Sequence, residues 1–254
     1  AVLMRRRLAV ITGGASATPL LLLFGLNAVD ELDRAAFFTL LPEIRDWFGV
    51  SLTTVLLAGT ISTLFGIAFV IPIGYLADRV NRLRLAAAGS GTWALFSVLT
   101  GMAPNVPLLL GARFGSGASK TLEPAHASLL ADYYPPAARG SVFAFYRAAD
   151  SIGRGIGPLL AGFLASWFIW QVPFFVFAVP CLVLAALVLV KLREPVRGEQ
   201  ERRAQGADEA VALSAETPPS ASESWRIARN VRTLRRIWFA VPFLIGVVQV
   251  LPAV

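Results

Sequence analysis

The sequence has little of what soluble enzymes and metalloproteins use for chemistry. Its 254 residues include one cysteine, Cys181, and one histidine, His126. A single cysteine excludes a disulfide within the chain, and no residues stand at metal-ligand spacing. A nucleophile with a matching base is also lacking. We therefore expect no metal site and no cofactor, and we expect a protein that is not an enzyme.

Charge is scarce as well, and long apolar runs take its place. Charged residues make up 15% of the chain and hydrophobic residues 56%, whereas an ordinary soluble domain has roughly 25% charged residues. A membrane core of roughly 30 Å is crossed by about 20 helical residues. The apolar runs predict an all-α integral membrane bundle, with six spans near residues 19–41, 52–74, 85–103, 106–130, 141–167 and 173–191 and a seventh beginning near residue 237.

The net charge of +7 could suggest a nucleic-acid partner, but its distribution argues for a membrane instead. Most basic residues lie in alternate loops, at residues 5–7, 79–84, 139 and 191–203. By the positive-inside rule the amino terminus is cytoplasmic, and six spans return the chain to that side. We expect a multi-pass protein of a bacterial cytoplasmic membrane that contacts lipids and binds no nucleic acid.

The polar stretch after the sixth span is predicted to be a cytoplasmic linker. Residues 194–224 are rich in Glu, Ala, Arg, Ser and Pro, a composition typical of flexible segments. From Trp225 onward, apolar residues at helical spacing alternate with arginines, which predicts a basic amphipathic helix on anionic headgroups or an ordinary connecting helix. The expected organisation is an amino-terminal segment at 1–18, a six-helix bundle at 19–191, the linker at 192–236 and the start of a seventh helix at 237–254.

Charged residues inside the predicted spans are the most informative feature. A charge at the bilayer centre costs roughly 2.5–3.5 kcal/mol even on a lenient scale, so these side chains must be paired or hydrated. Their helical spacing places them on shared faces of the first, fourth and fifth spans. This indicates a cavity that carries an ion or solute, with a purely structural ion-pair network as the alternative. The predicted cavity-lining residues are Asn27, Asp30, Glu31, Lys120, Arg147, Asp150 and Arg154.

The turn after the second span carries a family motif. Residues 74–85 read Gly-Tyr-Leu-Ala-Asp-Arg-Val-Asn-Arg-Leu-Arg-Leu, which resembles the G-x-L-x-D-R-x-G-R-[RK] signature of the major facilitator superfamily. Asn81 replaces the usual glycine, and asparagine also tolerates left-handed backbone geometry. The resemblance implies a cytoplasmic gate that latches the two halves of a transporter. The expected gate residues are Gly74, Asp78, Arg79 and Arg82, joined by Asp132 and Arg139 from a loop similar to the one that follows the family's fourth helix.

Two further spans extend the resemblance. Arg113 and Gly117 look like the family's R-x-x-x-G element, whose arginine is implicated in proton coupling. Residues 153–162 are similar to the family's G-x-x-x-G-P-x-x-G-G element, which is associated with antiporters. Small residues there allow helices to approach closely in lipid. The predicted helix-packing residues are Gly153, Gly157, Pro158 and Gly162.

The first span resembles the spinster branch of the superfamily. Asp33 and Arg34 precede a Leu-Pro-acid-Ile exit at residues 41–44. That branch has a glutamate about two turns after the arginine of the fourth span, where this chain has Lys120, with Glu123 three residues later. The resemblance implies that ion coupling involves Asp33, Arg34, Arg113 and Glu123.

Together these features predict half of a secondary transporter. The resemblance implies proton-coupled export or antiport of a small organic or amphiphilic molecule by alternating access. The expected partners are membrane lipids, a small-molecule substrate, protons and a second, carboxy-terminal six-helix half. The alternative is a transport-inactive sensor or a channel-like protein that keeps the same fold.

Overall fold

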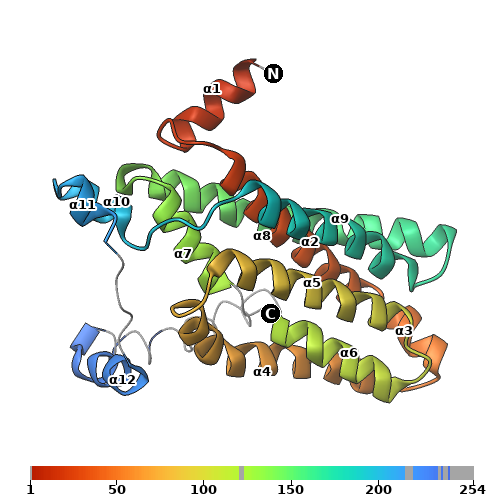
Figure 1. Ribbon diagram of the computed structural model, residues 1–254. Helices are drawn as coiled ribbons and strands as arrows, with labels where there is room; N and C mark the ends of the chain where they lie inside the picture. Colours follow the sequence, from red (N-terminus) through yellow and green to blue (C-terminus); the bar gives the residue numbers. More distant parts are fainter. Residues whose placement is uncertain (1, 120–122, 215–219, 234–235, 237–239, 241–254) are drawn as a thin grey trace. The chain divides into compact units, whose positions relative to one another are not determined.

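The computed structural model describes residues 2–119, 123–214, 220–233, 236 and 240 (Figure 1). Every regular element within these ranges is a helix, which confirms the predicted all-α fold class. The contacts divide the chain into two units, residues 1–216 and 217–254, and each is described by itself. The predicted start of a seventh helix at residues 237–254 lies almost entirely outside the described residues.

Seven long helices in the first unit coincide with the six predicted spans. The fourth predicted span corresponds to two helices, on either side of residues 120–122. The bounds are α2 (Thr18–Thr39), α4 (Leu52–Ala77), α5 (Arg82–Gly101), α6 (Val106–Ser119), α7 (Glu123–Tyr133), α8 (Pro136–Trp167) and α9 (Val172–Lys191). Shorter helices are α1 (Val2–Ile11), α3 (Leu41–Phe48), α10 (Glu199–Ala204) and α11 (Glu209–Ala212), and the second unit contains α12 (Ala221–Asn230).

Local sequence explains where the helices begin and end. Proline stands in the first turn of α2, α3, α8 and α9, where its missing N–H removes no helical hydrogen bond. The side chain of Ser51 caps α4, and Gly49 ends α3 with a φ of 63°. Asn81 does not use the left-handed conformation that asparagine tolerates. Its backbone is extended, and its side-chain oxygen accepts a 2.8 Å hydrogen bond from the Arg84 N–H, so asparagine suits this position as the N-cap of α5.

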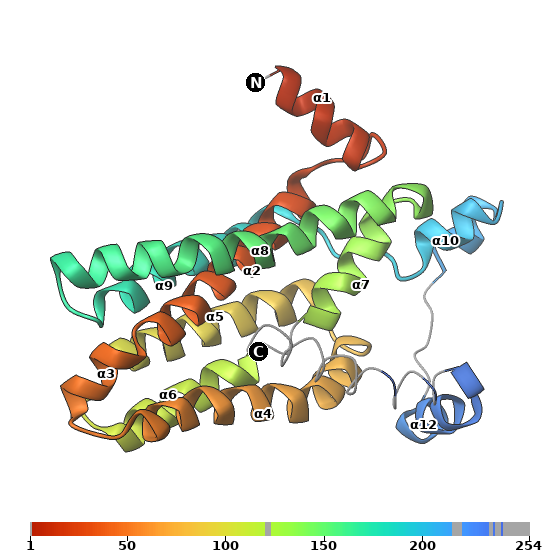
Figure 2. The ribbon, with the colours of Figure 1, turned by 180° about the vertical axis from the view of Figure 1, so that it is seen from behind.

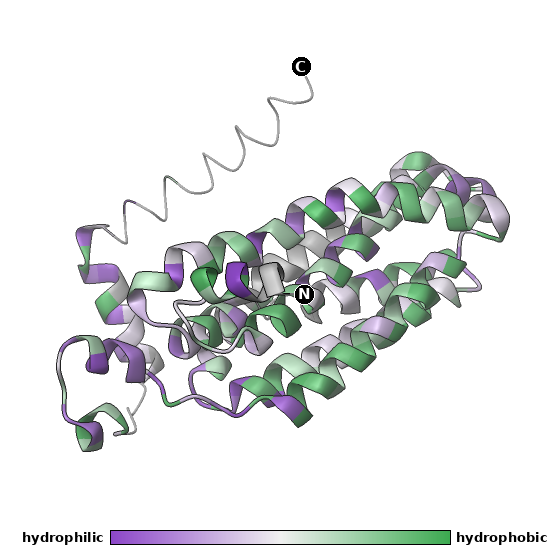
Figure 3. Ribbon diagram, turned by 90° about the horizontal axis from the view of Figure 1, so that it is seen from above, coloured by the Kyte–Doolittle hydropathy of each residue, from purple (hydrophilic) through white to green (hydrophobic). Residues whose placement is uncertain are grey.

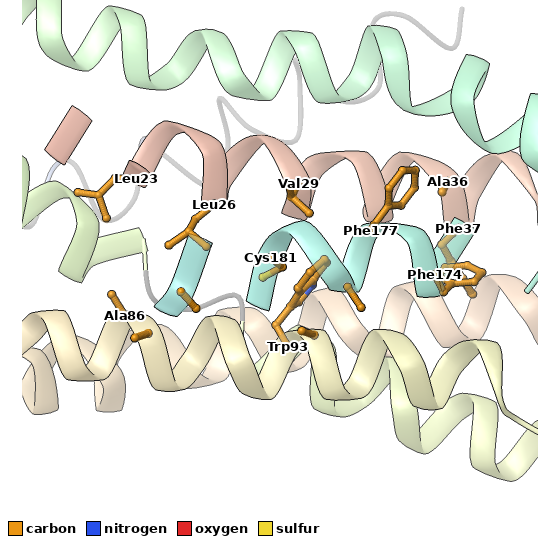
Figure 4. Packing of buried hydrophobic residues seen from close by; sticks show 14 of the residues in the cluster. Leu23, Leu26, Val29, Ala36, Phe37, Ala86, Trp93, Phe174, Phe177 and Cys181 are labelled. Atoms are coloured by element: carbon orange, nitrogen blue, oxygen red, sulfur yellow. The ribbon is translucent and has the colours of Figure 1, made fainter. Parts of the chain in front are cut away.

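Within the first unit, α2 lies along α8 and α9, while α5 packs against both α9 and α6 (Figures 1 and 2). Helix α4 packs against α6. Figure 4 shows the apolar interior where α2, α5 and α9 meet: Leu26 and Val29 of α2 lie near Trp93 of α5 and Cys181 of α9. This packing places the middle of α2 among three neighbouring helices.

Figure 3 shows hydrophobic residues along much of the helices. Many large apolar side chains are exposed on the outside of the bundle. Helix α9 carries an exposed row that includes Val179, Leu182, Val183 and Val190. By length and composition, α9 alone among the helices in the described part of the chain is suited to cross a membrane. One such helix is weak evidence by itself, because the core helix of a soluble protein has the same character.

The prediction of a flexible segment is wrong for the stretch from Glu194 to Ser214. This stretch contains α10 and α11, and the Arg202 guanidinium donates hydrogen bonds to the carbonyl oxygens of Arg197, Ala212 and Ser214 at 2.7 to 3.1 Å. Composition suggested flexibility because the stretch has few apolar residues, but hydrogen bonds and ion pairs to the bundle order it instead.

Candidate functional site

A buried ion pair lies at the centre of the candidate site. An Asp33 carboxylate oxygen, Oδ2, accepts a 3.0 Å hydrogen bond from the Arg113 guanidinium, and Oδ1 accepts a 2.7 Å hydrogen bond from the Ser97 hydroxyl. The side chains of Asp33 and Arg113 are 1% and 6% exposed. We call Asp33, Ser97 and Arg113 the Asp33 cluster. Three helices, α2, α5 and α6, meet in it.

Aromatic rings surround the charged part of this cluster. The Arg113 guanidinium carbon lies 4.4 Å from the centre of the Phe37 ring and 6.0 Å from that of Phe174. Both rings are fully buried. A cation over an aromatic face is attracted by the ring quadrupole, most strongly where water is excluded. The apolar surroundings therefore strengthen the dependence of Arg113 on the charge of Asp33, because a buried charge needs a partner.

Arg34 does not join its neighbour Asp33. Successive residues of a helix point about 100° apart, so the two side chains leave α2 in different directions. Arg34 is 43% exposed and lies 3.8 Å from the Glu31 carboxylate, one turn earlier, which is 8% exposed. The structure thus brings Asp33 and Arg113 together and leaves Arg34 outside the cluster.

The charged stripe of the fifth predicted span forms a chain of contacts along α8. The Asp150 carboxylate lies 3.5 Å from the Arg147 guanidinium, and the Arg154 Nε donates to the Asp150 backbone carbonyl. Between the two helices, the side-chain amide of Asn27 on α2 donates to Asp150 Oδ1 on α8 at 2.7 Å. Asn27 and Asp150, both predicted to line a cavity, therefore link α2 to α8.

The glycines of the fifth predicted span allow this close approach. A Cβ atom on Gly153 would lie 2.3 Å from Glu31 Cβ and 3.0 Å from the Glu31 carbonyl carbon, and one on Gly157 would lie 2.7 Å from Ala35 Cβ. Gly162 differs, because a Cβ there would meet nothing within 4 Å. Pro158 lies inside α8 without interrupting it. Gly153 and Gly157 thus contact α2, and Gly162 has an open side.

Replacing Gly153 with alanine is expected to destabilise the bundle, because neither the Glu31 backbone nor its Cβ can move without shifting α2. Overpacking of this kind costs about 1–3 kcal/mol. Denaturant unfolding of the purified protein measures the loss. Gly155→Ala is the matched control, since a Cβ two residues along the same helix meets nothing within 4 Å. Equal unfolding midpoints for the two variants would contradict the expected close contact.

A second charged cluster joins the first turn of α5 to the segment after α9. The Arg82 side chain is 0% exposed and forms ion pairs with Asp132 of α7 and with Glu194, the latter at 2.7 Å. Its guanidinium also donates to the Ser128 hydroxyl at 2.7 Å and to the Pro195 carbonyl at 2.9 Å. We call these five residues the Arg82 cluster.

Electrostatics keep this arginine charged. Burial would lower the pKa of Arg82, but the hydrogen bonds and negative charges of Glu194 and Asp132 outweigh it and raise the pKa above its ordinary value. The remaining Asp132 oxygen accepts a 2.9 Å hydrogen bond from the Gly198 N–H. The cluster therefore fixes the segment after α9 across the ends of α5 and α7.

The other predicted gate residues lie near the same segment but are more exposed. Asp78 is 3.4 Å from Arg197, and Arg139 pairs with Glu201 of α10 at 2.7 Å. The Arg79 guanidinium carbon lies 3.5 Å above the Tyr75 ring. A Cβ on Gly74 would meet nothing within 4 Å. Asp78 and Gly74 thus lie on an open part of the first unit.

Two predicted residues lie wholly or partly outside the described residues. Lys120 lies outside the described residues, and of Glu123 the structure describes the backbone at the start of α7 but not the side chain. Among the described residues, no group of three His, Cys, Asp or Glu side chains is arranged to hold a metal ion.

Several contact residues were not predicted from the sequence. Ser97 and Ser128 carry no motif, and Glu194 and Arg197 were assigned to a flexible segment. His126 Nδ1 lies 3.0 Å from the Tyr146 hydroxyl, and both residues are buried. The sequence signal for Glu194 and Arg197 is limited to their position directly after the sixth predicted span, on either side of Pro195.

Residues 23–253 match the sequence profile of the Major Facilitator Superfamily. The multidrug efflux pump LfrA of Mycolicibacterium smegmatis is 31% identical over 172 residues, which cover 66% of this chain and 34% of the pump. Protein spinster homolog 1 of Homo sapiens is 27% identical over 89% of this chain and 42% of the human protein. The chain therefore spans less than half the length of these relatives.

A solved structure has the same fold. A bacterial homolog of the human lysosomal transporter Spinster, in an inward-facing and occupied conformation, superimposes with a TM-score of 0.61 at 24% identity. The match covers 74% of this chain and 47% of that chain. The predicted resemblance to the superfamily and to its spinster proteins is thereby confirmed.

Proposed function

This chain belongs to the Major Facilitator Superfamily, a family of multi-pass membrane transporters rather than enzymes, and from that premise we propose that it works as the amino-terminal half of a secondary active transporter. A second six-helix half would complete the solute pathway, since such folds bind solute between their two repeats near the bilayer midplane. The bundle of α2 and α4–α9 would rock against that half during alternating access.

The buried ion pair between Asp33 and Arg113 carries the proposal of proton coupling. A carboxylate beside a buried arginine can exchange its ion pair for a proton, and that exchange changes how strongly α2 is held to α6. Ionisable residues inside membrane-spanning bundles commonly belong to ion or proton pathways. Glu123 is the second proposed proton acceptor, because it follows Arg113 on the same predicted span.

The proposed solute is a small organic or amphiphilic molecule that is exported or exchanged for protons. Support comes from the relatives, which include a multidrug efflux pump and spinster proteins. Asn27, Asp150 and the arginines of α8 supply hydrogen-bonding groups for polar parts of such a molecule. Asp78 and Arg79 would form part of a gate that closes against the second half.

A transport-inactive sensor or a channel-like protein is the alternative, because either could keep this fold. Solute flux through the full-length protein in proteoliposomes separates the three. A carrier gives flux that saturates with solute concentration and is driven uphill by a pH gradient. Flux that rises without saturation would indicate a channel, and binding without flux would indicate a sensor.

We expect the amino terminus and the segment from Leu192 to Arg236 to face the cytoplasm, because basic residues favour that side. Single cysteines placed at Arg7 and Ser214, in a Cys181→Ala background, should resist an impermeant thiol reagent in intact cells and react after lysis. A cysteine at Met102, which is exposed between α5 and α6, is the control that should react in intact cells. The reverse pattern would overturn the proposed orientation.

A further inference from the structure

The hydroxyl of Ser97 lies between two acceptors on different helices. Its oxygen is 2.7 Å from Asp33 Oδ1 on α2 and 3.1 Å from the backbone carbonyl oxygen of Phe174 on α9. Ser97 itself belongs to α5 and is completely buried. A serine hydroxyl has one hydrogen, so it can donate a well-formed hydrogen bond to only one of these acceptors at a time.

The charge of Asp33 decides which acceptor is the better one. An ionised carboxylate offers only acceptor oxygens and attracts the hydroxyl hydrogen more strongly than a neutral carbonyl does. A protonated carboxyl group is itself a donor. Because Arg113 already donates to Oδ2, the proton is expected on Oδ1, the oxygen that faces Ser97.

The helices around this position carry several other titratable or charged groups. Helix α6 contributes Arg113 and α9 contributes the Cys181 thiol, with Lys191 in its last turn; α5 carries Arg82 and Arg84 only at its first turn. The charged neighbours on α2 itself and those on α8, which packs along α2, are Asp30, Glu31, Arg34, Arg147, Asp150 and Arg154.

We propose that Ser97 is a positioning residue that acts as a hydroxyl switch. When Asp33 becomes protonated, the hydrogen bond that Ser97 donates is redirected from Asp33 on α2 to the Phe174 carbonyl on α9. When Asp33 is ionised, Ser97 donates to Oδ1. When Oδ1 takes up one proton from the aqueous phase, it donates that proton to the Ser97 oxygen, and the Ser97 hydrogen turns to the Phe174 carbonyl. No covalent bond other than the new O–H of Asp33 is made or broken.

Through this switch, protonation of Asp33 changes the hydrogen bonds between α5 and its neighbouring helices, in addition to its effect on the ion pair with Arg113. In the ionised state α5 is tied to α2 through a charge-assisted hydrogen bond; in the protonated state α5 gains a bond to α9. This inference rests on the proposed proton coupling, because it assigns a role to Asp33 protonation. The switch predicts a change in the titration midpoint of Asp33, however, and can be tested without any transport measurement.

Infrared difference spectroscopy of the purified full-length protein during a pH titration tests the switch. The C=O stretch of protonated Asp33 is identified by its absence in Asp33→Asn. In Ser97→Ala the midpoint at which this band appears should rise by about one to two pH units, the effect of losing one hydrogen bond to an ionised group. Ser97→Cys, a weaker donor of similar size, should give a smaller rise.

Ser90→Ala is the matched control. Ser90 is a buried serine seven residues earlier on the same face of α5, and its backbone carbonyl accepts from Cys181 rather than from the Asp33 cluster. Its titration midpoint should equal that of the wild type. An equal midpoint in Ser97→Ala, or no Asp33 band in the wild type over the pH range in which the protein stays folded, would overturn the switch.

The proposed hydrogen bond from Ser97 to the Phe174 carbonyl of α9 can be measured separately. In protein labelled with ¹³C at phenylalanine carbonyl carbons, protonation of Asp33 should shift an amide band that Phe174→Leu removes and that Ser97→Ala no longer shows. A Phe174 band that still shifts in Ser97→Ala would exclude Ser97 as the link. If Asp33→Asn keeps gradient-driven transport while Ser97→Ala moves the Asp33 midpoint, the proposed coupling fails and the switch stands.

Discussion

Asparagine in place of Asp33 is expected to abolish uphill transport driven by a proton gradient, while solute binding and downhill exchange remain measurable. With one proton exchanged per solute, a pH gradient of one unit supports about tenfold accumulation. An amide cannot take up and release that proton. The accumulation ratio in proteoliposomes of the full-length Asp33→Asn protein should therefore fall to about one.

The amide keeps the shape of the site, which makes the variant informative. The asparagine carbonyl oxygen can take the place of Oδ2 and accept from Arg113, and its NH2 group in the place of Oδ1 can donate to the Ser97 oxygen, but the amide leaves the Arg113 charge without a counter-charge. Loss of a buried partner costs about 3–5 kcal/mol, so folding must be measured in parallel. The double variant Asp33→Asn with Arg113→Gln removes both charges and controls for this loss.

Two outcomes would reject the assignment of Asp33. Full gradient-driven accumulation by a folded Asp33→Asn protein would show that its proton is not needed. Restoration of accumulation in the double variant would show that the single variant failed through instability. Glu123→Gln is the necessary companion, because a loss confined to that variant would move the coupling site to the fourth span.

The sequence predicted the helices well, because apolar runs of span length separated by prolines, glycines and basic turns leave few alternatives. It also predicted that Asp33 and Arg113 share one site. That inference came from a family resemblance, since nothing in the spacing within one helix reveals which residue of another helix lies opposite. Ser97 could not be predicted, because a single serine in an apolar helix has no periodicity or motif.

Arg34 and Glu194 show the same limit of sequence-based prediction, because the contacts between side chains differ from those expected. Arg34 was grouped with Asp33 because the pair resembles the Asp-Arg pair of the spinster branch, yet the side chains of adjacent helical residues point in different directions. Glu194 was assigned to a flexible linker on composition, although a single carboxylate that meets a buried arginine is enough to order the segment around it. The amino-acid composition of a segment does not reveal which charged residues it pairs with in the folded chain.

A large loss of stability is expected from Arg82→Ala. The Arg82 guanidinium holds two carboxylates, Asp132 and Glu194, together with a hydroxyl and a backbone carbonyl. Removing it leaves a nearly buried Asp132 carboxylate without its counter-charge. We expect the free energy of unfolding to fall by about 3–5 kcal/mol, measured by denaturant titration of the purified protein.

Arg84→Ala is the control for helix propensity and net charge, because Arg84 stands two residues along α5 with an exposed side chain. Exposed substitutions of this kind usually change stability by no more than about 0.5 kcal/mol. Arg82→Lys should recover only part of the loss, since an ammonium cannot reproduce the planar fork that reaches Asp132 and Glu194 at once.

A double-mutant cycle distinguishes the ion pair between Arg82 and Glu194 from the other contacts of Arg82. If Arg82 acts through Glu194, then Arg82→Ala and Glu194→Ala together should cost less than the sum of the two single losses, with a coupling energy of about 0.5–3 kcal/mol. Additive losses would mean that Arg82 does not stabilise the fold through Glu194, and that its effect comes from its other contacts, chiefly the ion pair with Asp132. The segment after α9 would then be held mainly by the Asp132 hydrogen bond to Gly198 and the contacts of Arg197, and Arg82→Ala would leave its protection from proteolysis unchanged.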